Sequence, residues 1–156
     1  MPASYSKQQM PLIHIAYRPP EHGWLALTLT LDGKVINIDA SDVPNNPLQE
    51  LLVALEDIAR GIDTSVWWHM EPASYFMYFQ RVADEVQLRL EYADESQRSR
   101  AKEVATVQGS MTRIVTPFWR FLREFQSHAF AEPHWPDVDY DRIHTIKLLL
   151  DASGEI

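Results

Sequence analysis

The chain has 156 residues, of which 46% are hydrophobic and 23% are charged, and these proportions are typical of a soluble globular protein with one domain. Its 14 Lys and Arg stand against 22 Asp and Glu, a formal charge of -8, so we expect no nucleic-acid partner. There is no cysteine, which excludes disulfides, thiolate nucleophiles and cysteine-based metal sites. No segment has the pattern of a signal peptide or a bilayer-spanning helix, so we expect a cytoplasmic protein without membrane contact.

Residues 1–10 are predicted to be a flexible leader, and residues 11–156 a single domain. A first strand is predicted at residues 12–17, where Arg18-Pro19-Pro20 ends it. The clearest local pattern follows: residues alternate on both sides of Asp32-Gly33, a dipeptide typical of a two-residue hairpin turn. This turn places Leu29 opposite Ile36, with their side chains on one face.

A helix is predicted to begin after Asn46, which can accept hydrogen bonds as the N-cap, with Pro47 in the first helical position. Apolar residues recur at helical spacing up to Gly61, which favours an end there. Glu56 and Arg60 are spaced to form an ion pair on the outer side.

Residues 66–82 contain a cluster of six aromatic side chains, and we interpret the segment as two strands. If Pro72-Ala73-Ser74 is the turn, Glu71 lies opposite Tyr75 and His69 lies opposite Met77. A second turn at Ala83-Asp84 places Phe79 opposite Leu88. The aromatic residues of this cluster are Trp67, Trp68, Tyr75, Phe76, Tyr78 and Phe79.

This register divides the side chains of the aromatic strands between two faces. The predicted core face holds Trp67, His69, Glu71, Tyr75, Met77, Phe79, Val86, Leu88 and Leu90. The reverse face is predicted to be an apolar patch, rimmed by charge, that binds a partner. Its residues are Trp68, Met70, Phe76, Tyr78 and Arg89. Two alternatives stay open: one of the helices covers this face, or an error of one residue at the turn exchanges the two faces.

The C-terminal part is predicted to contain an edge strand at residues 102–108 and then two helices. Ser110 is interpreted as a helix cap, and Pro117 either kinks the first helix or stands in its first turn, with the helix beginning at Thr116. Arg113, Arg120 and Arg123 give this helix a basic flank that either binds a carboxylate or phosphate group or complements the acidic surface. The last helix is predicted near residues 139–150.

Strands and helices are segregated along the chain, so the predicted fold class is α+β. We expect an antiparallel sheet of five to six strands, one helix inserted after the first hairpin and two C-terminal helices.

No catalytic, phosphate-binding or metal-binding motif is present in the sequence, and we therefore expect no metal site, no cofactor and no enzymatic activity. The leading hypothesis is a protein-binding module that uses the aromatic sheet face, either for another protein or for a second copy of itself. An inhibitor of the immunity or antitoxin type would fit these features by analogy. The alternative is a small-molecule-binding protein or enzyme with a pocket around His69, Glu71 and Arg81.

Overall fold

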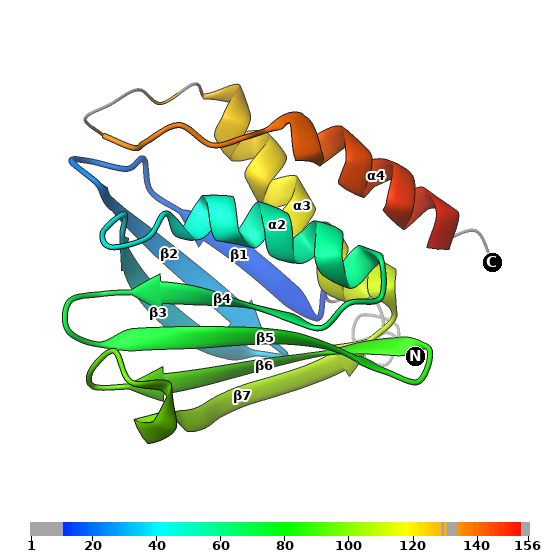
Figure 1. Ribbon diagram of the computed structural model, residues 1–156, viewed down its shortest axis with the longest axis horizontal. Coiled ribbons are helices and arrows are strands. Elements are labelled where there is room, and N and C mark those ends of the chain that lie inside the picture. Colours follow the sequence, from blue (N-terminus) through cyan, green and yellow to red (C-terminus); the bar gives the residue numbers. More distant parts are fainter. Residues whose placement is uncertain (1–10, 129, 131–133, 154–156) are drawn as a thin grey trace, which may run out of the picture.

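The computed structural model describes residues 11–128, 130 and 134–153, so the predicted leader lies outside the described residues (Figure 1). The strands are β1 (Ile13–Tyr17), β2 (Trp24–Leu31), β3 (Lys34–Ser41), β4 (Thr64–His69), β5 (Ser74–Val82), β6 (Glu85–Ala93) and β7 (Lys102–Gly109). The helices are α2 (Pro47–Ala59), α3 (Met111–Ser127) and α4 (Asp141–Ser153), with a 3-10 turn, η1, at Arg98–Arg100. None of the described helices combines the length and hydropathy needed to cross a membrane.

The fold is α+β with antiparallel pairing, as predicted, but the strands form two sheets rather than one sheet of five to six strands. Sheet A has the order β1-β2-β3, and sheet B has the order β4-β5-β6-β7. The break falls between β3 and β4. On the edge of β4 that faces away from β5, the backbone of Trp67 bonds to side chains rather than to a strand. Glu50 accepts from Trp67 N at 3.0 Å, and Asn45 donates to Trp67 O at 2.9 Å. Since these side chains occupy the edge, β3 does not extend sheet B.

The hairpin that joins β2 to β3 has the register that the sequence predicts. Leu29 lies opposite Ile36 and Leu31 opposite Lys34, across the Asp32-Gly33 turn. Both turn residues have positive φ, 48° and 87°, which is the geometry that Asp-Gly favours in a two-residue hairpin. The alternation therefore places one apolar row of each strand in the core.

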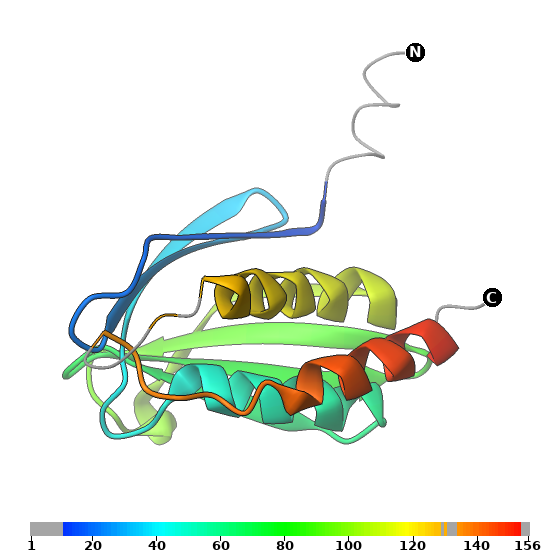
Figure 2. The ribbon, with the colours of Figure 1, turned by 90° about the horizontal axis from the view of Figure 1, so that it is seen from above.

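The inner faces of the two sheets meet the helices in one continuous core (Figures 1 and 2). Helix α3 packs against β1 of sheet A and against β6 and β7 of sheet B, whereas α2 packs on β4 and β5. Helix α4 lies on α2 and α3. The helices therefore cover one face of each sheet, and the opposite faces of both sheets point outward.

Helices α2 and α3 begin where the sequence predicts. Asn46 accepts from the backbone N–H groups of Leu48 and Gln49, with Pro47 next to it, and Ser110 accepts from Arg113 N at 3.1 Å. Gly61 (φ 86°) follows the end of α2, as expected. Helix α3 runs through Pro117 from Met111 to Ser127, so of the two alternatives the later start at Thr116 is wrong.

The register between β4 and β5 differs from the prediction, and this changes which side chains face the core. His69 lies opposite Ser74, three residues before the expected Met77, and Trp67 lies opposite Phe76 rather than Phe79. The tight connection is closed by a hydrogen bond from Met70 N to Ala73 O, with Glu71 at a φ of 54°. Because the shift is an odd number of residues, it turns every side chain of β4 to the opposite face.

Candidate binding face on the outer side of sheet B

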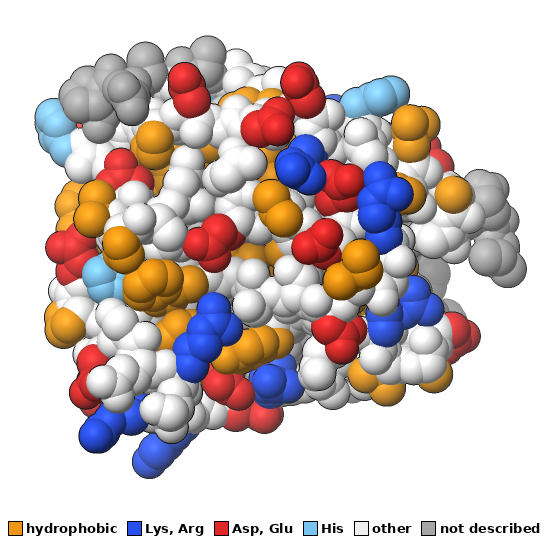
Figure 3. All heavy atoms as spheres, viewed as in Figure 1, with side chains coloured by type: hydrophobic (Ala, Val, Ile, Leu, Met, Phe, Trp, Pro, Cys, Tyr) orange, Lys and Arg blue, Asp and Glu red, His pale blue; other side chains and the backbone are white. Residues whose placement is uncertain are grey.

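The outer face of sheet B carries aromatic and arginine side chains in adjacent cross-strand rows. Val66, Met77 and Leu90 point into the core, so their neighbours along each strand point outward. One outward row joins Trp67, Phe76 and Glu91, and the next joins Ser65, Tyr78 and Arg89. Figure 3 shows hydrophobic side chains next to Lys or Arg and a His in the region where Figure 1 draws β4 to β6.

Six side chains on this face form a continuous series of ring and guanidinium contacts, which we call the aromatic–arginine stack. In order, its members are His69, Trp67, Phe76, Arg98, Tyr78 and Arg89. The successive separations are 5.1 Å and 6.5 Å between ring centroids, then 4.8 Å, 5.6 Å and 4.5 Å from guanidinium carbon to ring centroid. Each separation lies within or near the range of favourable aromatic and cation–π contacts.

Arg98 is the exposed centre of the stack and comes from η1, not from a strand. Its guanidinium covers Phe76, which is only 1% exposed, and donates to Ser65 Oγ at 3.3 Å and Tyr78 Oη at 3.4 Å. Within the described residues no carboxylate lies within 4 Å of it. Arg89 differs, since it forms an ion pair with Glu91 at 2.9 Å. Arg98 therefore carries a positive charge that no described acidic side chain neutralises.

Trp67 is held in place on both its ring and its backbone. The indole N–H donates to the buried Ser74 Oγ at 2.8 Å, and the backbone N–H and C=O are bonded to Glu50 and Asn45. The ring lies nearly parallel to Phe76, at 13°. This end of the stack is preorganised, because these contacts already hold the indole in one orientation.

The predicted partner-binding residues are divided between the two faces. Phe76, Tyr78 and Arg89 lie on the outer face, as expected. Trp68 does not: it is 1% exposed and packs in the core, and Met70 packs against the same core. The grouping of Trp68 and Met70 with the outer residues is wrong because the register of β4 is shifted.

Trp67, His69 and Arg98 belong to the stack but were not predicted to lie on the outer face, since Trp67 and His69 were assigned to the core face. The alternative in which the two faces are exchanged would have placed Trp67 correctly, so the sequence contained that possibility. Arg98 lies in a charged loop without periodicity, between β6 and β7, and its position over Phe76 depends on how that loop folds back.

The three residues of the predicted alternative pocket do not come together. His69 Nδ1 lies 2.8 Å from Val43 O, and Glu71 accepts from Ser41 Oγ at 2.7 Å. Arg81 is at the other end of β5, seven residues from the partner of His69, or about 23 Å at the usual rise of a strand. Its guanidinium donates to Ala83 O at 3.2 Å.

Outside the stack, the groups with altered acidity are mainly tyrosines. Burial, with the nearby Tyr17 and Asp137, raises the pKa of Tyr140 to about 12. Burial also raises the pKa of Tyr17, with a contribution from Glu124. Both phenols therefore remain protonated at neutral pH. In the described part of the chain, no three His, Asp or Glu side chains converge as metal ligands would.

Comparison with protein-family models, with curated proteins and with solved structures finds no match to this chain.

Proposed function

We propose that this protein is a binding module for another protein, which docks on the aromatic–arginine stack and presents an Asp or Glu side chain to Arg98. The observation that carries the proposal is the stack itself. Trp, Tyr and Arg dominate the binding energy of protein interfaces, and here all three adjoin on the sheet face opposite to the one against which the described α-helices pack.

The chemistry of Arg98 defines the contact that the partner supplies. A guanidinium presents five N–H donors in a plane and binds a carboxylate through two parallel hydrogen bonds. Arg98 makes two long hydrogen bonds, to Ser65 and Tyr78, and most of its N–H donors are left without a partner among the described residues. The cation–π contact with Phe76 and the two hydrogen bonds orient the group, so that a carboxylate approaching from solvent meets a fixed fork.

The net charge of the chain acts at longer range. A chain with a formal charge of -8 attracts basic proteins during diffusional encounter, whereas Arg98 selects one acidic side chain at the contact. By analogy with immunity-type and antitoxin-type inhibitors, the partner would be a basic enzyme that presents one acidic side chain at the contact. A second copy of this chain also carries acidic side chains and is the alternative partner.

The test compares Arg98→Glu with Arg100→Glu. Both residues belong to η1 and are exposed, but Arg100 lies outside the stack, near Glu95 at 3.8 Å. A protein captured by the wild-type chain is purified, and its binding is measured by titration calorimetry. We expect Arg98→Glu to weaken binding by about tenfold to a hundredfold, since a charged hydrogen-bonded pair becomes repulsive. Arg100→Glu should change it by less than about threefold.

Light scattering on the purified chain addresses the alternative partner. A wild-type dimer that dissociates in Arg98→Glu, but not in Arg100→Glu, identifies the partner as a second copy. Equal binding by both variants, or a strictly monomeric chain for which no saturable protein partner is found, contradicts the proposal.

A further inference from the structure

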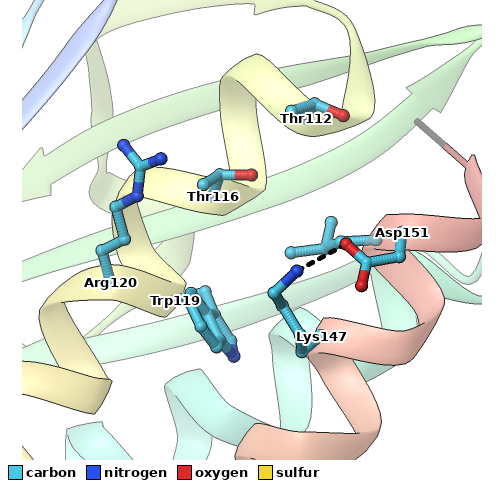
Figure 4. Close-up of a pocket in the computed structure, with 7 residues that line it drawn as sticks. Thr112, Thr116, Trp119, Arg120, Lys147 and Asp151 are labelled. Carbon is cyan, nitrogen blue, oxygen red and sulfur yellow. Dashed lines mark hydrogen bonds and ion pairs between the residues drawn. The ribbon is translucent and has the colours of Figure 1, made fainter. Parts of the chain in front are cut away.

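A second feature, distant in sequence from the stack, is a cleft between α3 and α4 with a volume of about 500 Å³ (Figure 4). Its lining residues are Thr112, Thr116, Trp119 and Arg120 from α3, and Lys147, Leu150 and Asp151 from α4. In Figure 4 the two threonine side chains point from α3 toward α4, and Trp119 lies between the two helices. The volume is within the range of natural small-molecule sites.

The cleft has an apolar floor and a polar rim. Trp119 and Leu150 form the floor and are only 6% and 5% exposed. The indole N–H of Trp119 donates to Ile143 O at 2.8 Å, which fixes the ring and joins α3 to the first turn of α4. A few polar groups around a fixed aromatic surface are the usual composition of a ligand site.

The polar groups on the α3 side lie on one helical row. Thr112, Thr116 and Arg120 are spaced four residues apart, so neighbouring side chains are about 6 Å from each other. The interaction drawn among the lining residues in Figure 4 is the ion pair from Lys147 to Asp151, at 2.6 Å. The two hydroxyls and the guanidinium are therefore not engaged by the other lining residues.

The charge around the cleft favours an anion. Lys147 is neutralised by Asp151, whereas no carboxylate of the described residues lies within 4 Å of Arg120. Arg123, whose guanidinium carbon lies 5.2 Å from the Trp119 ring, adds another positive charge nearby. Within a chain of charge -8, this is a local excess of positive charge beside an apolar surface.

We propose that the cleft between α3 and α4 binds a small organic anion. The carboxylate or phosphate group of the ligand accepts hydrogen bonds from Arg120 and the threonine hydroxyls, and its apolar body packs on Trp119 and Leu150. Of the two explanations that the sequence leaves open for the basic flank of this helix, anion binding is the one that accounts for the unengaged donors on this row.

The experiment uses phenyl phosphate and benzoate as probes, with the neutral benzamide and inorganic phosphate as reference compounds. Binding to the whole chain is followed by NMR at the indole N–H of Trp119, which is assigned as the signal lost in Trp119→Phe. We expect saturable shifts with at least one aromatic anion. Benzamide should bind more weakly because it has no charge, and inorganic phosphate because it has no apolar body. The stronger of the two anions identifies the head group.

Two variants locate the anion. Arg120→Gln removes the charge from the cleft and should weaken binding by about tenfold or more. Arg113→Gln removes an exposed charge from the same helix outside the cleft and should leave the affinity within about twofold. Circular dichroism establishes that both exposed substitutions preserve the fold, and Arg98→Glu should leave this binding unchanged.

The proposal is overturned by any of three results. The first is that neither aromatic anion produces a saturable shift of the Trp119 signal at concentrations of about 10 mM. The second is that benzamide binds as tightly as the aromatic anions. The third is that Arg113→Gln weakens anion binding as much as Arg120→Gln does.

Discussion

Two adjacent tryptophans, Trp67 and Trp68, have opposite roles because a strand directs successive side chains to opposite faces. Trp68 lies in the core, where it lines a small enclosed space together with Leu27, Met77 and Phe118. Its indole N–H has no hydrogen-bond partner among the described residues. Trp67 lies on the outer face, half-buried, with its N–H bonded to Ser74. A side chain that packs in the core and one that lies on the outer face of sheet B are therefore neighbours in the sequence.

We expect Trp68→Ala to lower the free energy of unfolding by about 4 kcal/mol, because it removes a large buried side chain and leaves a cavity. Trp67→Ala should cost about 1 to 2 kcal/mol, which is the loss of one stacking contact and one hydrogen bond. Urea denaturation followed by circular dichroism measures both values. If Trp67→Ala were the more destabilising variant, the assignment of the two faces would be incorrect.

At the scale of elements, α4 is fastened to α2 by polar contacts as well as by packing. Glu56 on α2 forms ion pairs with Arg60 at 3.1 Å and with Arg142 of α4 at 2.7 Å. Gln49 accepts from Asp139 N at 2.7 Å, just before α4. Burial alone would raise the pKa of the Glu56 carboxyl, but the hydrogen bonds from Arg60 and Arg142 outweigh it and hold the pKa below its ordinary value.

The lowered pKa of Glu56 predicts a pH-dependent contribution to stability. Such a carboxylate binds fewer protons in the folded chain, so its contribution is present above the pKa of the unfolded chain. It disappears as the pH falls through the lower pKa of the folded chain. We expect Glu56→Gln to be about 1 kcal/mol less stable than the wild type at pH 7. The difference should close below about pH 4.

Urea denaturation at several pH values measures this difference. Glu124→Gln is the control, because this exposed glutamate has no ion pair among the described residues and should show no comparable difference. A gap for Glu56→Gln that is unchanged at low pH would contradict the account.

The elements also differ in how far the sequence determines them. The Asp32-Gly33 and Ala83-Asp84 turns are two residues long, and each fixes the register of its hairpin, so both registers are confirmed. The connection at 70–73 is longer and contains Pro72, so several registers satisfy the alternation, and the predicted one is wrong. The position of Arg98 depends on contacts between distant segments, which periodicity does not encode. Phe76, Tyr78 and Arg89 were therefore placed on the correct face, whereas Arg98, the centre of the aromatic–arginine stack, was not predicted.

At the scale of the whole molecule, one group of buried side chains includes residues from both sheets and all three helices. Side chains of Leu29 in sheet A and Leu88 in sheet B, which are 2% and 0% exposed, belong to it. The tip of the β2–β3 hairpin is also tied to sheet B, because Lys34 Nζ donates to Val104 O at 2.6 Å. The two sheets are therefore parts of one packed unit.

This connected core predicts a single cooperative unfolding transition. Leu29→Ala and Leu88→Ala should each lower the stability by about 3 kcal/mol and shift the whole transition, whether it is followed by tryptophan fluorescence or by far-ultraviolet circular dichroism. Leu148→Ala, at a side chain that is 56% exposed on α4, should change it by less than about 0.5 kcal/mol. Two separate transitions, each sensitive to only one of the core substitutions, would show that the sheets unfold independently.

The pairing of Asn45 and Glu50 with the Trp67 backbone limits how copies of this chain can associate. A strand from a neighbouring molecule that approached β4 sideways would find the central donor and acceptor of that edge already bonded. Growth of fibrils by continuous pairing across molecules is therefore blocked at this margin. Sheet B then has two remaining places for a second copy, the opposite edge strand β7 and its outer face, where side chains rather than peptide groups decide which molecules adhere.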